Sequence, residues 1–343
     1  MTRPAAVAAG SFLFVAFAAP TPAPLRSLFS ALGFTLSARQ PKGPWERWRQ
    51  GGIDFLLDAT LCPASARFVE QHGPGACAFA VTVEDSDEAV EVAQASGAAA
   101  LPADPGLPLP GVAGIDGAAL HLLDPGDRNR YEAMFTAVDA VGAGAGLTTI
   151  DHLTHNVRRG RMDWWADFYR DALGLTEIRH FTIAGQRTGL RSRAMGNDTG
   201  IRIPINESAD DSSQIAEFLH QFNGEGIQHI ALATADILTS VDRLKAAGIG
   251  FLDTPATYYE DLPDRLPQSG LDVAALHDRR ILADGGPGHG GGLLLQIFTD
   301  PLVGPLFFEI IERRGNQGFG EGNFQALFEA IERDQVRRGV LPA

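Results

Sequence analysis

The sequence predicts an α+β fold built from one strand–helix–strands unit that occurs four times. Three observations predict it: a helix that ends in a small residue and a glycine recurs four times, an apolar strand precedes each such helix, and further apolar or alternating segments follow it. Because several strands follow each helix, curved antiparallel sheets with outer helices fit better than a doubly wound parallel sheet.

The elements of the four units follow one another in the same order. The first strands are expected at 11–19, 77–83, 149–157 and 226–234. The helix ends read LFSALGFTL (28–36), EVAQASGAAALPA (91–103), FYRDALGLTEI (168–178) and VDRLKAAGIGFLDTP (241–255). A glycine after the last helical turn suits the left-handed conformation of a helix cap. The later strands include GGIDFLLDA, AALHLLDP, TGIRIPINE and GPLFFEIIER.

The four units form two pairs and predict two domains, 1–140 and 149–343, joined by the Gly- and Ala-rich segment VDAVGAGAGLTTI. Each domain is expected to be a curved open sheet, or half-barrel, around a hollow, which is a natural small-molecule site. The first strand, SFLFVAFAAP, also resembles the apolar part of a secretory signal. We favour the strand because the repeat requires one at this place.

The segment GEGNFQALFEAIERDQVRRG, residues 320–339, predicts an amphipathic C-terminal helix with Asn323 as its N-cap. The preceding stretch RGNQGFGEG is dense in glycine and is expected to act as a hinge. Such a helix is interpreted either as a lid over the hollow or as a helix docked for stability.

Composition excludes several classes of partner. With 28 Lys and Arg against 42 Asp and Glu, the formal net charge is −14. This sign argues against nucleic-acid or anionic-membrane binding, which need a basic face. No segment reaches the length of about 20 apolar residues that spans a membrane. The two cysteines, Cys62 and Cys77, provide neither a disulfide framework nor a zinc site, which favours a cytoplasmic location.

A metal site is predicted from positions that match between units. Of nine histidines, only His152 and His229 occupy the same place in their units, each in the first strand. The repeat should bring these two strands together. Glu309 lies between two apolar residues in GPLFFEIIER, and a buried carboxylate is tolerated when it binds a metal or is paired. The alternative for Glu309 is an ion pair with Arg313.

Two imidazoles and one carboxylate with open positions are the ligands of non-heme iron(II) oxygenases. Zinc accepts the same three ligands, so the donor types alone leave both metals open. His155 follows His152 by three residues and therefore points to the opposite face of a strand, which indicates a structural role or a place behind the ligands. The first pair of units has no such set at matching strands.

Several motifs resemble the 4-hydroxyphenylpyruvate dioxygenase family of the vicinal oxygen chelate superfamily, whose fold is the repeated unit described above. They are IDHLTHNV, TGLRSRAM, IRIPINE, FNGEGIQHIA, LLLQIF, FFEIIERRG and GFGEGNFQALFEAIERDQVRRG. The resemblance covers about 149–340 and is much looser in 11–124, where it is confined to patterns such as RWRQGGIDFLL.

The resemblance implies an iron(II)- and O2-dependent enzyme that converts 4-hydroxyphenylpyruvate to homogentisate and CO2 in the breakdown of tyrosine and phenylalanine. His152, His229 and Glu309 match the family's ligands to one Fe(II) per chain. The family also commonly forms homodimers or homotetramers. The substrate carries its own α-keto acid, so no separate keto acid is needed.

The same comparison implies a substrate pocket of amides, a serine and phenylalanines. Gln228 also matches the family, but it precedes a ligand on its strand and is expected to face away, in the layer behind the ligands. The residues matched to the pocket are Ser192, Asn206, Gln214, Gln296, Phe298, Phe307, Phe319, Asn323 and Phe324.

Three other functions compete. Hydroxymandelate synthase uses the same substrate, metal and fold but oxidises the benzylic carbon; Phe307 and the intact GFGEGNF segment favour the ring-hydroxylating enzyme. A non-catalytic binding protein of this fold would have no reason to carry all three ligands. Metal-dependent isomerases and ring-cleaving dioxygenases of the superfamily lack this C-terminal sequence.

Overall fold

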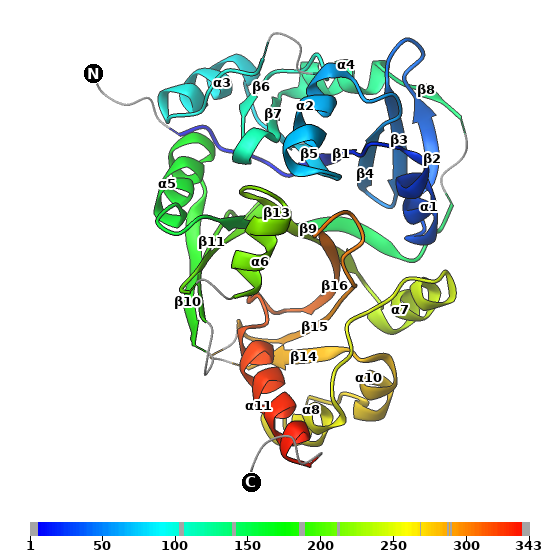
Figure 1. Cartoon of the computed structure of the whole chain (residues 1–343), viewed down its shortest axis with the longest axis vertical. Coiled ribbons are helices and arrows are strands. Elements are labelled where there is room, and N and C mark those ends of the chain that lie inside the picture. Colours follow the sequence, from blue (N-terminus) through cyan, green and yellow to red (C-terminus); the bar gives the residue numbers. More distant parts are fainter. Residues whose placement is uncertain are drawn as a thin grey trace.

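The structure, a computed structural model, contains two eight-stranded curled sheets, one above the other in Figure 1. It confirms the predicted α+β fold of four units in two pairs. The predicted domain limits, 1–140 and 149–343, stay a prediction. The outermost residues of the two domains and part of the segment that joins them lie outside the described residues. The structure describes residues 6–102, 106–138, 142–184, 189–210, 213–267, 269–286, 288 and 290–337.

The first sheet has the strand order β6-β7-β5-β1-β4-β3-β2-β8. Its strands are β1 Phe12–Ala18, β2 Thr35–Arg39, β3 Trp45–Gln50, β4 Ile53–Asp58, β5 Gly75–Thr82, β6 Gly111–Ala113, β7 Ala119–Leu123 and β8 Thr136–Ala137. The apolar segment near the N-terminus is thus β1, a buried strand in the middle of this sheet, as predicted.

The second sheet has the order β10-β11-β12-β9-β13-β16-β15-β14. Its strands are β9 Leu147–Val157, β10 Thr176–Ala184, β11 Gly189–Gly196, β12 Arg202–Ser208, β13 Gly226–Thr234, β14 Leu282–Gly285, β15 Leu293–Phe298 and β16 Phe307–Arg314. In both sheets the first strands of the two units pair antiparallel at the centre, and the last strand of each unit pairs parallel with its own first strand.

The first helix of each unit is α1, α3, α5 or α7, and a glycine in the left-handed region follows each of them: Gly33, Gly97, Gly174 and Gly248. The predicted caps are therefore confirmed. The helices are α1 Ala23–Ala31, α2 Pro63–His72, α3 Ser86–Ala95, α4 Pro125–Ala133, α5 Met162–Leu173, α6 Gln214–Gln221, α7 Ile237–Ala246, α8 Ala256–Glu260, α9 Leu262–Arg265, α10 Val273–Arg279 and α11 Glu321–Arg337, with a 3₁₀ turn at Ile115–Gly117.

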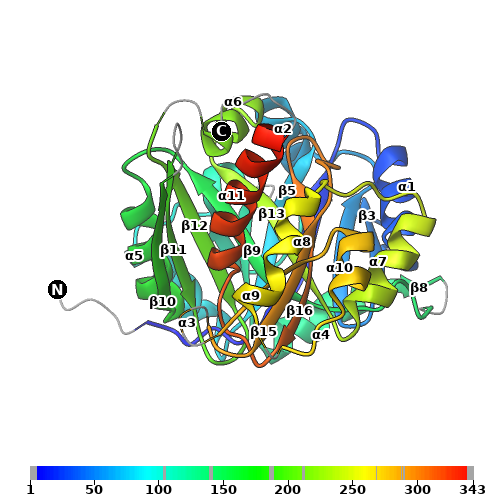
Figure 2. The ribbon, with the colours of Figure 1, turned by 90° about the horizontal axis from the view of Figure 1, so that it is seen from below.

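Two units depart from the simple pattern. In the second unit β6 and β7 follow the helix, with the isolated bridge between Ala100 and Val112 beside them, and the later β8 pairs with β2 of the first unit. In the fourth unit, helices α8, α9 and α10 separate α7 from β14. The inserted helices matter for the site because α11 packs on α8, and Figure 2 shows both helices across the open side of the second sheet.

The register of three neighbouring strands positions the predicted ligands. Ala231 on β13 is paired with His152 on β9 at one side and with Glu309 on β16 at the other. His229 precedes Ala231 by two residues and therefore projects from the same face of the sheet. Three residues far apart in the sequence are thus brought to the inner face of one sheet.

The opposite face of these strands packs on the first sheet. Phe308, next to Glu309, lies with its ring centroid 6.0 Å from that of Phe55 on β4, and His155 lies 5.9 Å from Phe79 on β5. His155 is fully buried there, with its Nδ1 3.1 Å from the hydroxyl of Tyr169. The prediction that His155 faces away from the ligands is confirmed.

The C-terminal helix is present, but its predicted start was wrong. Asn323 is not the N-cap of α11, because the helix already begins at Glu321. The side chain of Asn323 is buried, and its Oδ1 lies 2.6 Å from the hydroxyl of Tyr258 on α8. In the part of the chain that the structure describes, we find no helix that combines the length and the apolar character of a membrane span.

Candidate metal centre

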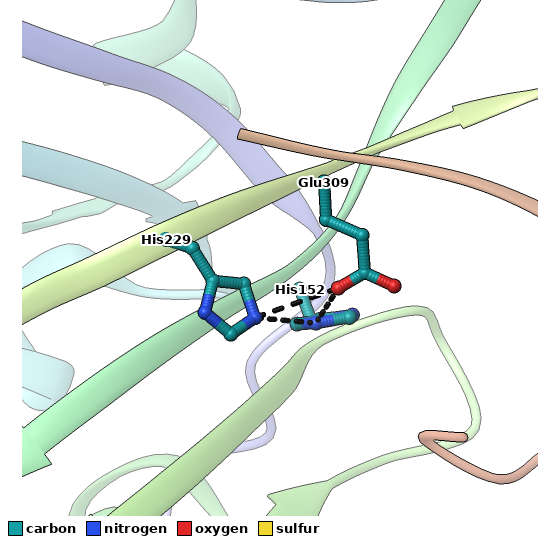
Figure 3. Close-up of side chains that lie close together, drawn as sticks. All are labelled: His152, His229 and Glu309. Atoms are coloured by element: carbon teal, nitrogen blue, oxygen red, sulfur yellow. Dashed lines mark hydrogen bonds and ion pairs between the residues drawn. The ribbon is translucent and has the colours of Figure 1, made fainter. Parts of the chain in front are cut away.

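Three side chains converge on one point of the second sheet (Figure 3). His152 Nε2 lies 3.3 Å from His229 Nε2 and 3.2 Å from Glu309 Oε2, and the third distance, from His229 Nε2 to Glu309 Oε2, is 3.4 Å. His152 and Glu309 are 3% exposed, and the side chain of His229 is 12% exposed. No other group of three metal-ligating residues is found among the described residues.

The outer nitrogens of both imidazoles face acceptors, which fixes where their protons are. Nδ1 of His152 donates to Asp151 Oδ1 over 2.8 Å, and Nδ1 of His229 donates to Gln228 Oε1 over 3.0 Å. With the protons on Nδ1, each neutral ring presents the lone pair of Nε2 to the centre. Two lone pairs and a carboxylate then face one another, an arrangement that a cation satisfies.

The donor set fits a metal ion in spacing as well as in chemistry. Nitrogen and oxygen ligands about 2.0–2.2 Å from one ion lie roughly 3–3.5 Å from each other, and the three measured separations fall within this range. Tetrahedral and octahedral metals both allow such spacing. The residues therefore fit the iron(II) that the sequence resemblance implies, and fit zinc equally well.

The three side chains at the centre shift one another's pKa values. Burial raises the pKa of Glu309, but the two imidazoles outweigh it and lower the pKa to about 2. Burial lowers the pKa of His152, and Glu309 and Asp151 outweigh that effect and raise it. His229 lacks a carboxylate on its outer nitrogen, and burial lowers its pKa. When no metal is bound, the carboxylates of Glu309 and Asp151 therefore favour the protonated, positively charged form of His152.

An ion pair between Glu309 and Arg313 was the alternative to metal binding by Glu309, and the structure, which describes both residues, does not contain this pair. The guanidinium of Arg313 instead makes two hydrogen bonds to the carboxylate of Asp151, at 2.7 and 2.8 Å. Glu309 is left with the two imidazoles as its partners. The carboxylate of Glu309 is thus available to an ion.

A cavity of about 50 Å³ adjoins the three side chains. Of the residues predicted to bind substrate, five line it: Ser192, Asn206, Phe298, Phe319 and Phe324. Phe307 stacks on the ring of His229, with centroids 4.9 Å apart. Gln296 is fully buried, and neither its amide oxygen nor its amide nitrogen has a hydrogen-bond partner within the described residues. The hydroxyl of Ser192 is likewise buried without one.

Four predicted substrate contacts do not line this cavity: Gln214, Gln296, Phe307 and Asn323. Gln214 is the first residue of α6, its side chain is exposed, and it does not line the cavity. A helix begins here, with Ser213 as the N-cap, and this turns Gln214 outward. Asn323 is engaged with Tyr258 and with Arg265, whose Nη2 lies 3.4 Å from its Oδ1. Asn323 therefore connects α11 to the helices beneath it.

Four residues that line the cavity were not predicted from the sequence: Thr154, Phe181, Leu190 and Pro204. Strand alternation contained the signal for three of them. Thr154 follows His152 by two residues, and Leu190 and Pro204 precede Ser192 and Asn206 by two, so all three share a face with a predicted site residue. Phe181 is the register partner of Ser192 on the neighbouring strand, which only the structure reveals.

Comparisons with known proteins give the family. A family model described as "Hydroxyphenylpyruvate dioxygenase, HPPD, N-terminal" matches residues 3–139, and one for the Glyoxalase/Bleomycin resistance protein/Dioxygenase superfamily matches residues 149–262. 4-Hydroxyphenylpyruvate dioxygenase of Pseudomonas aeruginosa is 47% identical, over 96% of this chain and 95% of the relative. The chain belongs to the 4-hydroxyphenylpyruvate dioxygenase family. The relative from Legionella pneumophila (strain Corby) is 49% identical over 96% of both chains.

The family resemblance therefore also includes the first half of the chain, where the sequence patterns had given only a looser match and where a family model matches residues 3–139. Two solved structures add detail. A xylose isomerase-like TIM barrel/4-hydroxyphenylpyruvate dioxygenase fusion protein is 29% identical, with a TM-score of 0.82, over 98% of this chain and 54% of that one. A mutant of 4-hydroxymandelate synthase from Streptomyces coelicolor is 26% identical, with a TM-score of 0.79, over 95% and 99%.

Proposed function

We propose that this chain is an iron(II)-dependent dioxygenase that converts 4-hydroxyphenylpyruvate and O2 to homogentisate and CO2. One observation carries the proposal: in a chain of this family, two imidazole lone pairs and a buried carboxylate meet within 3.4 Å of one another. Relatives that bear the name 4-hydroxyphenylpyruvate dioxygenase match nearly the whole chain, which supports the same activity.

His152, His229 and Glu309 would hold the iron. These three residues would leave positions on the iron open, where the substrate's keto acid could chelate it, and iron held there would supply the chemistry that activates O2. Asp151 and Gln228 would keep the protons of the two imidazoles on their outer nitrogens. Gln228 would thus act from behind the ligands, on the side opposite the substrate.

The pocket residues would bind and orient the substrate. Phe298, Phe319 and Phe324 supply apolar walls that suit a phenyl ring and keep water away from it. The hydroxyl of Ser192 and the amide of Gln296 are buried without protein hydrogen-bond partners among the described residues. A ligand that forms hydrogen bonds with such groups removes their desolvation penalty and therefore binds more tightly. We assign them, with Asn206, to the polar groups of the substrate.

Hydroxymandelate synthase is the second candidate because a mutant of that enzyme is among the structures similar to this chain. The product distinguishes the two. Purified protein with iron(II) and ascorbate should consume O2 in the presence of 4-hydroxyphenylpyruvate and release homogentisate. Release of 4-hydroxymandelate would instead assign the chain as a hydroxymandelate synthase. If iron-loaded protein consumed no O2, the result would favour a non-catalytic binding protein. Glu309→Gln serves as the inactive control.

The cytoplasmic location and the homo-oligomeric state belong to the same proposal and rest on the sequence and the family. Size-exclusion chromatography with light scattering would test the oligomeric state. A monomer would contradict the expected dimer or tetramer without affecting the proposed reaction.

A further inference from the structure

The segment that connects β16 to α11, residues 315–320, is tied to a predicted metal ligand through one arginine. Arg313 Nε and Nη2 donate to Asp151 Oδ2 and Oδ1, and Asp151 Oδ1 also accepts the Nδ1 proton of His152. The remaining nitrogen of Arg313, Nη1, donates to the carbonyls of Gly318 at 2.7 Å and Asn316 at 3.3 Å. The planar guanidinium of Arg313 therefore contacts both Asp151 and the connecting segment.

Phe319 of the connecting segment closes the same group of contacts. Its ring centroid lies 5.7 Å from the guanidinium carbon of Arg313 and 5.5 Å from the imidazole of His152, in an edge-to-face arrangement. Phe319 also lines the cavity. A second arginine, Arg202, also links the connecting segment to Asp151. It donates to the side chain of Gln317 at 3.0 Å and lies 3.7 Å from Asp151.

Asp151 can hold His152 only while its own charge is compensated. Its side chain is 5% exposed, and a buried carboxylate without a partner is costly. A guanidinium has a rigid fork of donors, so its hydrogen bonds on one edge fix the direction of those on the other. Displacement of the connecting segment would therefore shift Arg313, then Asp151, then the orientation of His152.

We propose that Arg313 is a positioning residue that couples the connecting segment over the cavity to the orientation of His152. This inference rests on the proposed metal-binding role of His152. Because a coupling between two sites is reciprocal, metal binding should order the connecting segment, and a disordered segment should weaken metal binding. Partners behind metal ligands typically contribute 10- to 100-fold in affinity.

The test compares Arg313→Gln with a matched control, Arg314→Gln, at the next position of the same strand. Arg314 is exposed and pairs with Glu312 at 2.6 Å, away from Asp151. Two quantities are measured under anaerobic conditions: the Kd for Fe(II), by competition with a chelator, and hydrogen–deuterium exchange of residues 315–320 with and without Fe(II).

In the wild type and in Arg314→Gln, Fe(II) should slow exchange of the segment. In Arg313→Gln the Kd should rise 10- to 100-fold, and Fe(II) should no longer slow exchange. A wild-type Kd, or an undiminished effect of Fe(II) on exchange in Arg313→Gln, would overturn the proposal. A purely structural role would change thermal stability but leave the response of the segment to Fe(II) intact.

Arg313→Gln leaves Asp151 buried and unpaired, so the variant can fail to fold. Asp151→Asn/Arg313→Gln removes both charges and keeps an oxygen to accept the His152 proton. It should fold, and it should also lack the effect of Fe(II) on the segment; retention of that effect would overturn the proposal. The homogentisate assay of the wild type is independent, because iron affinity and segment exchange are measured without substrate.

Discussion

His121 on β7 occupies the register position in the first sheet that Glu309 on β16 occupies in the second. The central strands β5 and β13 both begin at a glycine, and their sixth residues, Ala80 and Ala231, are paired with His121 and Glu309 respectively. The two halves of the chain therefore present equivalent places for ligands, and the difference between them is one of side chains.

Only one of the three equivalent places in the first sheet has a metal-ligating side chain. Phe14 is paired with Ala80 as His152 is with Ala231, and Ala78 stands where His229 stands. Nδ1 of His121 donates to the carbonyl of Pro110, and burial lowers the pKa of His121 to about 4, so the ring is neutral. A single neutral imidazole against a phenyl ring does not hold an ion.

One metal ion per chain is the first prediction. Metal analysis of iron-loaded protein should give one Fe(II) per chain for the wild type and for His121→Phe. Glu309→Ala should lose more affinity than the 10- to 100-fold typical of a residue behind the ligands, because a ligand itself is removed. A second equivalent of iron that disappears in His121→Phe would contradict the assignment of a single centre.

Metal binding should release protons and weaken as the pH falls. In the metal-free protein, burial disfavours the charged form of His152, but Glu309 and Asp151 outweigh it and raise its pKa. Metal ligands must be deprotonated, so this proton competes with Fe(II). Calorimetric titrations near pH 6.5, in two buffers of different ionisation enthalpy, should give different heats. Identical heats would show that no proton leaves.

The same charges should make the metal-free fold sensitive to acid. Glu309 has a folded pKa of about 2 against an ordinary value of 4.5, so it contributes stability that is present above pH 4.5 and lost as the pH falls towards 2. The raised pKa of His152 acts in the opposite sense, since its contribution is present below pH 6.5 and lost as the pH rises through the folded pKa.

Urea unfolding of the metal-free protein should therefore show less stability at pH 3 than at pH 5. In Glu309→Gln this decrease should be smaller, because the group that titrates has been removed. An equally steep decrease in the variant would assign the acid sensitivity to other carboxylates.

Gln296→Met should stabilise the metal-free protein and impair catalysis at the same time. Neither amide atom of Gln296 has a protein partner, and an unsatisfied buried polar group costs about 1–3 kcal/mol, which methionine avoids. If the amide binds substrate, its loss should raise KM for 4-hydroxyphenylpyruvate by about 10-fold or more. Thermal unfolding and steady-state kinetics measure the two effects.

Gln214→Met is the matched control, since Gln214 is exposed at the start of α6, whereas Gln296 is fully buried. It should change neither stability nor KM by more than a small amount. An increase in KM for Gln214→Met would restore the substrate contact that the sequence predicted. Unchanged kinetics in Gln296→Met would remove Gln296 from the substrate site.

The repeat made both the fold and the three convergent residues predictable, because each lies at a fixed place in its unit. The pocket was harder to predict. Gln214 follows the family motif, but its side-chain direction depends on where α6 begins, which sequence patterns locate only within a few residues. The link from His152 through Asp151 to Arg313 spans 162 positions between its last two members and depends on the sheet register, which no local pattern contains.

Two glycines with similar φ angles allow a test of how closely the connecting segment packs against Gln296. Gly320 has φ +78° and Gly248 has φ +90°. A Cβ at Gly248 would meet nothing within 4 Å, whereas a Cβ at Gly320 would lie 2.1 Å from the amide oxygen of Gln296. Alanine at either position costs about 1–2 kcal/mol for the left-handed backbone.

Gly320→Ala should therefore affect substrate binding, and Gly248→Ala should not. Because Gln296 is fully buried, its amide cannot move into solvent to relieve the contact, and either the amide or the connecting segment must shift. We expect Gly320→Ala to lose at least as much stability in urea unfolding as Gly248→Ala, with KM for 4-hydroxyphenylpyruvate raised about 10-fold in Gly320→Ala alone. Equal kinetics in the two variants would mean that the segment has room to move without disturbing Gln296.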